Sequence, residues 1–137
     1  MNSSIKVEPG FKGMISGVTR SPSYQRAMIS LKNAAGRVMA SSILAGDGEN
    51  IPMKQEVNGM QGWAFGPFNE MMTMHVAVEH SRSENGTFVP SKSIVPIPMR
   101  METDMHNPKT YMVCTMLSQD AVDNDYNDSI LSVFQYK

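Results

Sequence analysis

Short segments in which apolar and polar residues alternate run through this 137-residue chain, and turn-forming residues separate them. The clearest is MTMHVAVEH, in which Met72, Met74, Val76 and Val78 share one face of an extended strand. Helical periodicity is almost absent. Strand-like alternation occurs near residues 4–8, 11–19, 25–33, 37–44, 61–66, 72–80, 93–102, 109–117 and 129–137. We therefore expect a single all-β domain over residues 1–137, an antiparallel β-sandwich of about nine strands.

Turn chemistry supports this division of the chain. The stretches NAAG, AGDGEN, SENG and HNP are rich in the residues that favour turns. Pro96 and Pro98 cannot donate a hydrogen bond to a neighbouring strand, so the strand near 93–102 should be bulged or at a sheet edge. Trp63 and Phe65 share one face of their segment, which favours a core strand over a sugar-stacking role.

Charge and composition exclude several classes of protein. The chain has 12 basic and 13 acidic residues, a net charge of −1, which argues against a nucleic-acid binder with a basic face. No apolar run is long enough to span a membrane, and the start MNSSIKVEPGFKG does not resemble a secretion signal. A cytoplasmic product is expected, held in inclusions or released without a signal peptide. Cys114 is the only cysteine, which excludes an intrachain disulfide and a cysteine-based metal cluster.

The sequence gives little support to catalysis. His75, His80 and His106 do not have the spacing of a metal site, and His75 falls on the outward face of its strand. Cys114 lies within an apolar strand, where it is typical of a small buried hydrophobe. The chain has neither a phosphate-binding glycine loop nor a nucleophile elbow. We expect a binding or structural protein and no enzyme.

The most acidic stretch is SQDAVDNDYND, residues 118–128, just before the last expected strand. Asp123, Asp125, Asn127 and Asp128 lie close enough in sequence to turn several oxygens toward one centre. Calcium prefers 6 to 8 oxygen ligands of this kind, whereas magnesium and zinc suit such a set less well. A helix–loop–helix calcium site is excluded, because Asp128 and Phe134 stand where that motif needs glycine and glutamate. The alternative is a solvated turn; the density of carboxylates favours calcium.

This stretch resembles the signature of the calcium-dependent bacterial lectins that bind fucose and mannose, the fucose-binding lectin II type. The six residues DNDYND match that signature in full, and similarity elsewhere is faint, extending through VTRSPSYQRAMISLKN and the central strands. The resemblance implies a nine-stranded antiparallel sandwich and no catalysis. It also implies that two calcium ions lie in the acidic loop, where vicinal hydroxyls of one monosaccharide complete their coordination.

The resemblance implies a role for individual residues. Asp123, Asp125, Asn127 and Asp128 would be calcium ligands, and Gln119 would occupy the position of a further ligand. Asp120 would accept a hydrogen bond from the sugar, while Ser21 and Ser23 would lie in the loop that sets sugar specificity.

Three positions depart from the family pattern. Gln119 stands where the family has a bidentate glutamate, and Arg20 stands where it has an asparagine. Family members also end in glycine, whose carboxylate reaches a neighbour's calcium, whereas this chain ends in Tyr136 and Lys137. These departures leave open whether one or two calcium ions bind, and whether the sandwich keeps its sugar binding.

The chain has 14 methionines, several in polar surroundings, such as Met53, Met60 and Met105. By composition it resembles the methionine-rich crystalline inclusion proteins of insect-pathogenic, nematode-associated bacteria. A storage protein that keeps the lectin sandwich is therefore the main alternative, and a calcium-stabilised interaction module without a sugar is another. In each case a near-neutral surface favours homo-oligomers or larger self-assembly.

Overall fold

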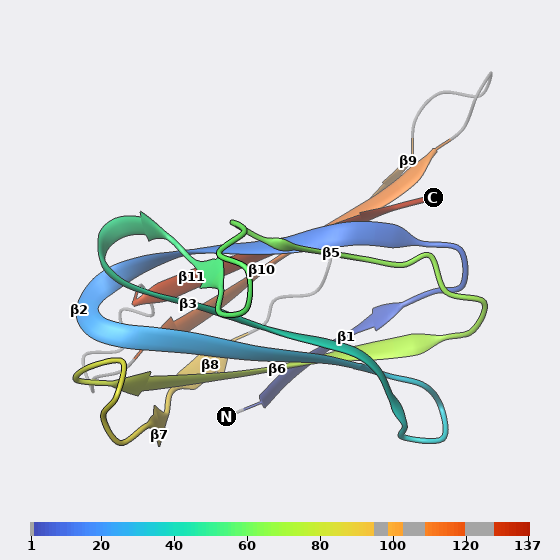
Figure 1. Cartoon of the computed structure of the whole chain (residues 1–137). Coiled ribbons are helices and arrows are strands. Elements are labelled where there is room, and N and C mark those ends of the chain that lie inside the picture. Colours follow the sequence, from blue (N-terminus) through green and yellow to red (C-terminus); the bar gives the residue numbers. More distant parts are fainter. Residues whose placement is uncertain (1, 95–98, 103–108, 120–127) are drawn as a thin grey trace.

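The computed structural model describes residues 2–94, 99–102, 109–119 and 128–137. These residues form strands and connecting turns with no helix, so the predicted all-β antiparallel class is confirmed (Figure 1). The strands are β1 (Asn2–Val7), β2 (Lys12–Lys32), β3 (Val38–Pro52), β4 (Lys54–Gln55), β5 (Trp63–Phe65), β6 (Met72–Ser81), β7 (Val89–Pro90), β8 (Lys92–Ile94), β9 (Met99–Glu102), β10 (Thr110–Gln119) and β11 (Ser129–Tyr136). The described part contains no helix that could span a membrane.

One long strand connects the two layers of the fold. The first part of β2 pairs with β11 and β5, and the part after residue 23 pairs with β6. β3 follows β2 on both sides of its bend, and the central strand order is β1-β6-β2-β11-β10-β8. Figure 1 shows β2 turning at one end of the molecule, so that its two parts run through opposite layers. A single curled sheet thus encloses the core.

The bend in β2 corrects two predictions. The segments near 11–19 and 25–33 are parts of one continuous strand, and AGDGEN lies inside β3 rather than in a turn. The turn-forming residues of AGDGEN lie where the paired strands β2 and β3 bend. There the β2–β3 register shifts between Thr19 and Arg20 and again between Ser21 and Gln25. Gly48 and Asn50 have positive φ angles of 99° and 54° beside these shifts. Such backbone geometry is typical of bulges, which increase strand curvature.

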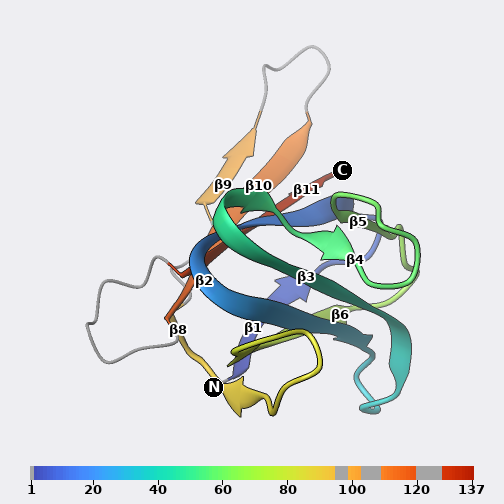
Figure 2. The ribbon, with the colours of Figure 1, turned by 60° about the vertical axis from the view of Figure 1, so that its left-hand side comes forward.

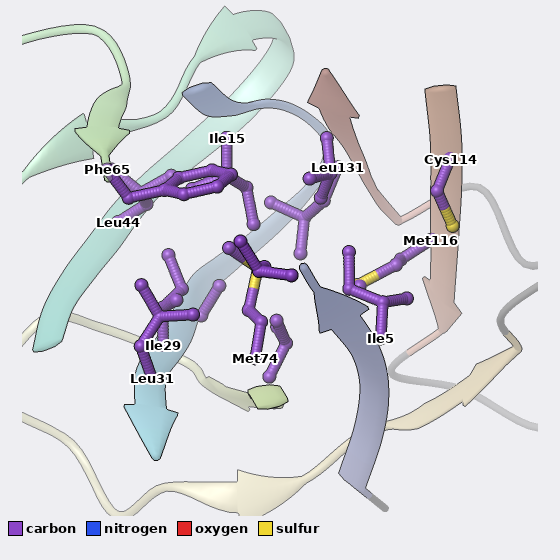
Figure 3. Close-up of a cluster of buried hydrophobic side chains, with 14 of the residues drawn as sticks. Ile5, Ile15, Ile29, Leu31, Leu44, Phe65, Met74, Cys114, Met116 and Leu131 are labelled. Carbon is purple, nitrogen blue, oxygen red and sulfur yellow. The ribbon is translucent and has the colours of Figure 1, made fainter. Parts of the chain in front are cut away.

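The core contains the predicted apolar faces (Figure 3). β6 buries Met72, Met74, Val76 and Val78 as expected, and β10 buries Met112, Cys114 and Met116 rather than its other face. Phe65 is buried and Trp63 packs against the core, which confirms the core-strand interpretation of that segment. The prediction that Met53 lies in a polar setting is wrong. Its side chain is only 1% exposed, because the bend of β2 and β3 folds it inward.

The segment near 93–102 forms two short strands on one side of β10. β8 pairs with the Gln119 end of β10, and β9 pairs with the Thr110 end, with the register offset by one residue between them. Both lie at the sheet edge, as expected for this segment. Pro96, Pro98 and the HNP stretch lie outside the described residues.

Candidate functional site

The acidic stretch connects two neighbouring strands, and the structure describes both of its ends. Gln119 is the last residue of β10, and Asp128 directly precedes β11. The backbone N–H of Asp128 donates to the carbonyl of Ser118 at 3.0 Å, and Ser118 pairs with Ser129 in the ladder. Asp120, Asp123, Asp125 and Asn127 lie outside the described residues. The structure therefore fixes where this loop starts and ends.

The bend of β2 lies against the same point. The backbone N–H of Arg20 donates to the carbonyl of Asp128 at 2.8 Å, and Thr19 pairs with Ser129. Three segments distant in sequence thus meet here: the end of β10, the start of β11 and the bend of β2 (Figure 2). The fold brings Gln119 and Asp128 beside the segment that contains Ser21 and Ser23.

The described residues at this junction are polar and buried. Gln119 is 1% exposed and Asp128 is 9% exposed, and both have further interactions. Ser118 and Ser129 are also buried, and their hydroxyls are in direct contact. A buried carboxylate is costly unless polar partners or a cation compensate its charge. This end of the sandwich therefore gathers several buried polar side chains in one place.

The two serines of the bend occupy different environments. The Ser21 hydroxyl is buried and accepts the backbone N–H of Ser23 at 3.1 Å, so it holds the bend in shape. Ser23 is half-buried and lines a cavity of about 580 Å³. Of the two, Ser23 is the one that can reach a ligand through its side chain.

Arg20 directs its charge away from the start of β11. Its guanidinium forms a 3.1 Å ion pair with Glu49 on β3, and both side chains are substantially exposed. Its backbone N–H donates to the carbonyl of Asp128. The cation that stands in the place of the family's asparagine is therefore paired with a carboxylate on β3.

The remaining reactive residues are accounted for by packing and hydrogen bonds. Burial raises the pKa of the Cys114 thiol, in agreement with its place in the core. His75 is half-buried on the outward face of β6, and His106 is outside the described residues. No group of three or more histidine, cysteine or acidic side chains suited to a metal occurs in the part of the chain that the structure describes.

The sequence did not reveal the cavity beside Ser23. His80, Ser81, Arg82, Gly86, Thr87 and Val89 complete its lining. These residues belong to the end of β6, to the connection with β7 and, for Val89, to β7 itself. In the connection the sequence indicated only the turn SENG. No local signal could reveal the cavity, because it forms between segments about 60 residues apart in sequence, as the pairing of Tyr24 with Ser81 shows.

Comparison with solved structures identifies the fold. The chain superposes on a Chromobacterium violaceum lectin solved with alpha-methyl-fucoside, with a TM-score of 0.57, 14% identity, and coverage of 96% of this chain and 93% of the lectin. A high-affinity mannose-binding lectin of Ralstonia solanacearum gives a TM-score of 0.54 at 17% identity, with 96% and 93% coverage. The C-terminal domain of a Burkholderia cenocepacia lectin gives 0.54 at 18% identity, with 98% and 95% coverage.

The chain therefore has the fold of these bacterial lectins over nearly its whole length. The resemblance in fold predicted from DNDYND and the strand pattern is confirmed. No protein-family model matches the sequence, and no curated protein is significantly similar to it.

Proposed function

We propose that this protein binds carbohydrate through calcium held between β10 and β11. One observation carries the proposal: on a fold shared with sugar-binding lectins, the Asp128 end of the acidic loop is held by backbone hydrogen bonds to β10 and to the bend of β2. The described donors fit the ion, since the Gln119 amide and the Asp128 carboxylate offer the hard oxygens that calcium prefers. Asp123, Asp125 and Asn127 would supply further oxygens.

The residues of the chain have separate tasks in this mechanism. Calcium, when bound, supplies coordination positions that vicinal sugar hydroxyls can take. Asp128 would bind the ion through its side chain while its backbone joins β10 to β2, so the ligand rests on a rigid base. Asp120 and Ser23 would hydrogen-bond the sugar, and Ser21 would keep the bend in shape through the N–H of Ser23. Binding without catalysis is the proposed activity.

The charge of the site bears on the number of ions. Gln119 is neutral, so the site has one carboxylate fewer than the family pattern. Calcium affinity depends on the number of charged ligands, so one fewer should weaken calcium binding at this site. We propose that at least one ion binds and that titration decides between one and two.

The test is calcium titration by calorimetry on metal-stripped protein, followed by thermal melts and titration with mannose and fucose. We expect calcium to bind and raise Tm, and the sugars to bind only with calcium present. Asp128→Asn should weaken calcium binding by tenfold or more, because it removes a ligand charge while keeping the backbone hydrogen bonds. Asp47→Asn is the matched control, since Asp47 is exposed on β3.

Two results would contradict the proposal. One is a native protein that releases no heat with calcium and shows no change in Tm. The other is calcium binding without any sugar binding, which would favour a calcium-stabilised interaction module.

A second function, storage in a self-assembled form, is favoured by one exposed surface. The outward face of β2, β11 and β10, here called the outer apolar face, carries Met14, Phe134, Tyr136 and Tyr111. Met14 and Phe134 are 47% and 44% exposed and stand opposite each other in the ladder. Apolar patches of this kind mark interaction sites, and a net charge of −1 offers little repulsion between copies. We propose a second copy of the chain as its partner.

A further inference from the structure

We propose that the cavity beside Ser23 binds the carboxylate of an acidic saccharide, so that the site takes charged sugars in preference to neutral ones. The inference rests on the proposed function because Ser23 lines the cavity and belongs to the bend of β2 that meets the acidic loop. The cavity measures about 580 Å³, within the range of small-molecule sites.

The wall of the cavity is a short hairpin. β6 and β7 pair through His80 with Val89 and Glu79 with Pro90, and residues 82–88 connect them. Within this connection the N–H of Gly86 donates to the carbonyl of Ser83 at 3.1 Å. A Cβ atom on Gly86 would lie 2.3 Å from the Ser81 hydroxyl, so a larger residue would require the Ser81 side chain to move. The turn therefore has a defined shape against the end of β6.

Aromatic contacts fix the hairpin to β2. The rings of Phe88 and Tyr24 pack edge to face, with 6.1 Å between their centroids. The Arg26 guanidinium lies over the Phe88 ring, 3.8 Å from the centroid of that ring. Edge-to-face aromatic pairs and cation–π contacts of this kind are stabilising. The hairpin and the bend thus hold Arg82 and Ser23 on the walls of one cavity.

The described lining residues favour an anion, because Arg82 is a cation and no carboxylate is among them. Arg82 is exposed and forms no ion pair with any residue that the structure describes. No carboxylate is among the lining residues, and the nearest strand acid, Glu79, is paired with Arg26. Glu84, on the same turn, lines a separate cavity with Tyr24. Burial raises the pKa of Tyr24, and the carboxylates of Glu84, Glu56 and Asp47 raise it further.

The donors match a carboxylate attached to a sugar. The guanidinium of Arg82 can bind both oxygens of a carboxylate at once, a geometry that a neutral hydroxyl cannot use. The Nδ1 atom of His80 lies 2.8 Å from the Ser91 hydroxyl, which leaves Nε2 for a ligand. The hydroxyls of Ser23 and Thr87 complete a rim suited to the sugar ring.

The test compares two sugars that differ only at C6, methyl α-mannoside and methyl α-mannuronoside, with calcium present. We expect the mannuronoside to bind about tenfold more tightly, which corresponds to one good hydrogen-bonded ion pair. Arg82→Gln should abolish this preference while leaving the affinity for the mannoside unchanged. Arg37→Gln is the matched control, because Arg37 is an exposed arginine on the turn between β2 and β3. This turn lies at the end of the molecule opposite the β6–β7 hairpin (Figure 1).

A second readout separates this inference from the proposed function. Amide NMR shifts of His80, Arg82 and Thr87 should change with glucuronate in the native protein and not in Arg82→Gln. If neither methyl α-mannoside nor methyl α-mannuronoside binds but glucuronate causes these shifts, the lectin mechanism fails and the carboxylate site stands. The carboxylate site is overturned if methyl α-mannoside binds while the preference for the mannuronoside and the glucuronate shifts are both absent. It is also overturned if the preference and the shifts both persist in Arg82→Gln.

Discussion

Methionine is unusually frequent in this chain, with 14 residues, and it has two distinct structural roles. Met53, Met72, Met74, Met112 and Met116 fill the core, where a flexible thioether packs irregular gaps. Met14, Met39, Met60 and Met71 are between 42% and 61% exposed. Composition alone therefore cannot assign methionine a function, because the same side chain serves as core filler and as surface.

A matched pair of substitutions measures this difference. Met53→Ala should lower the free energy of unfolding by about 2–5 kcal/mol, because it removes a fully buried side chain and leaves a cavity. Met60→Ala should change it by less than about 0.5 kcal/mol, since that side chain is 61% exposed. Urea denaturation followed by tryptophan fluorescence gives both values. Similar effects for the two variants would contradict the assignment of Met53 to the core.

At the scale of elements, the pairing of β2 with β11 sets both the core and the candidate site. This ladder runs from Lys12 opposite Tyr136 to Thr19 opposite Ser129, where it meets the acidic loop. Near its far end a Cβ atom on Gly13 would lie 1.9 Å from the carbonyl oxygen of Phe134. The two backbones therefore approach closely enough to require glycine.

Gly13→Ala should consequently destabilise the protein more than Gly36→Ala. At Gly36 no atom lies within 4 Å of an added Cβ, and the cost is that of a positive φ angle of 82°, roughly 1–2 kcal/mol. At Gly13 the obstacle is a backbone atom, which cannot rotate away. We therefore expect the free energy of unfolding to fall by about 3 kcal/mol or more. The midpoints of urea unfolding rank the two variants. The reverse order would show that the β2–β11 spacing adjusts to the added methyl group.

At the scale of the whole molecule, the outer apolar face predicts self-association. Phe134 stacks on Tyr136 with centroids 5.6 Å apart, and the Lys12 ammonium lies 5.2 Å from the Tyr136 centroid. Phe134→Lys should place a charge at the centre of this face without disturbing the core, because the side chain is 44% exposed. Sedimentation velocity should show association of the native chain over a concentration series and a monomer for the variant.

Val57→Lys is the control for this experiment, since Val57 is 96% exposed outside that face. Equal disruption by both variants would attribute the effect to net charge. A native chain that remains monomeric at every concentration would remove the outer apolar face as an association surface and weaken the storage function.

From the sequence alone came the all-β class, the buried face of strands such as β6, and the kinship in fold with the lectins. Alternation with a period of two is a local property, and it fixes which side chains of a strand point inward regardless of what that strand pairs with. Met72, Met74, Val76 and Val78 were predicted correctly for this reason. Asp128 was named as a candidate ligand from the acidic pattern, and Gln119 from the resemblance to the lectin family.

Only the tertiary structure decided what depends on partners distant in the chain. The bend that makes one strand of residues 12–32, the inward turn of Met53, and the pairing of Arg20 with Glu49 each arise from the β2–β3 pairing. The cavity shared by Ser23 and Arg82 likewise requires the pairing of β2 with β6. Local patterns specify which way a side chain points, whereas the register between strands specifies which side chains meet, and the candidate sites of this protein are made by such meetings.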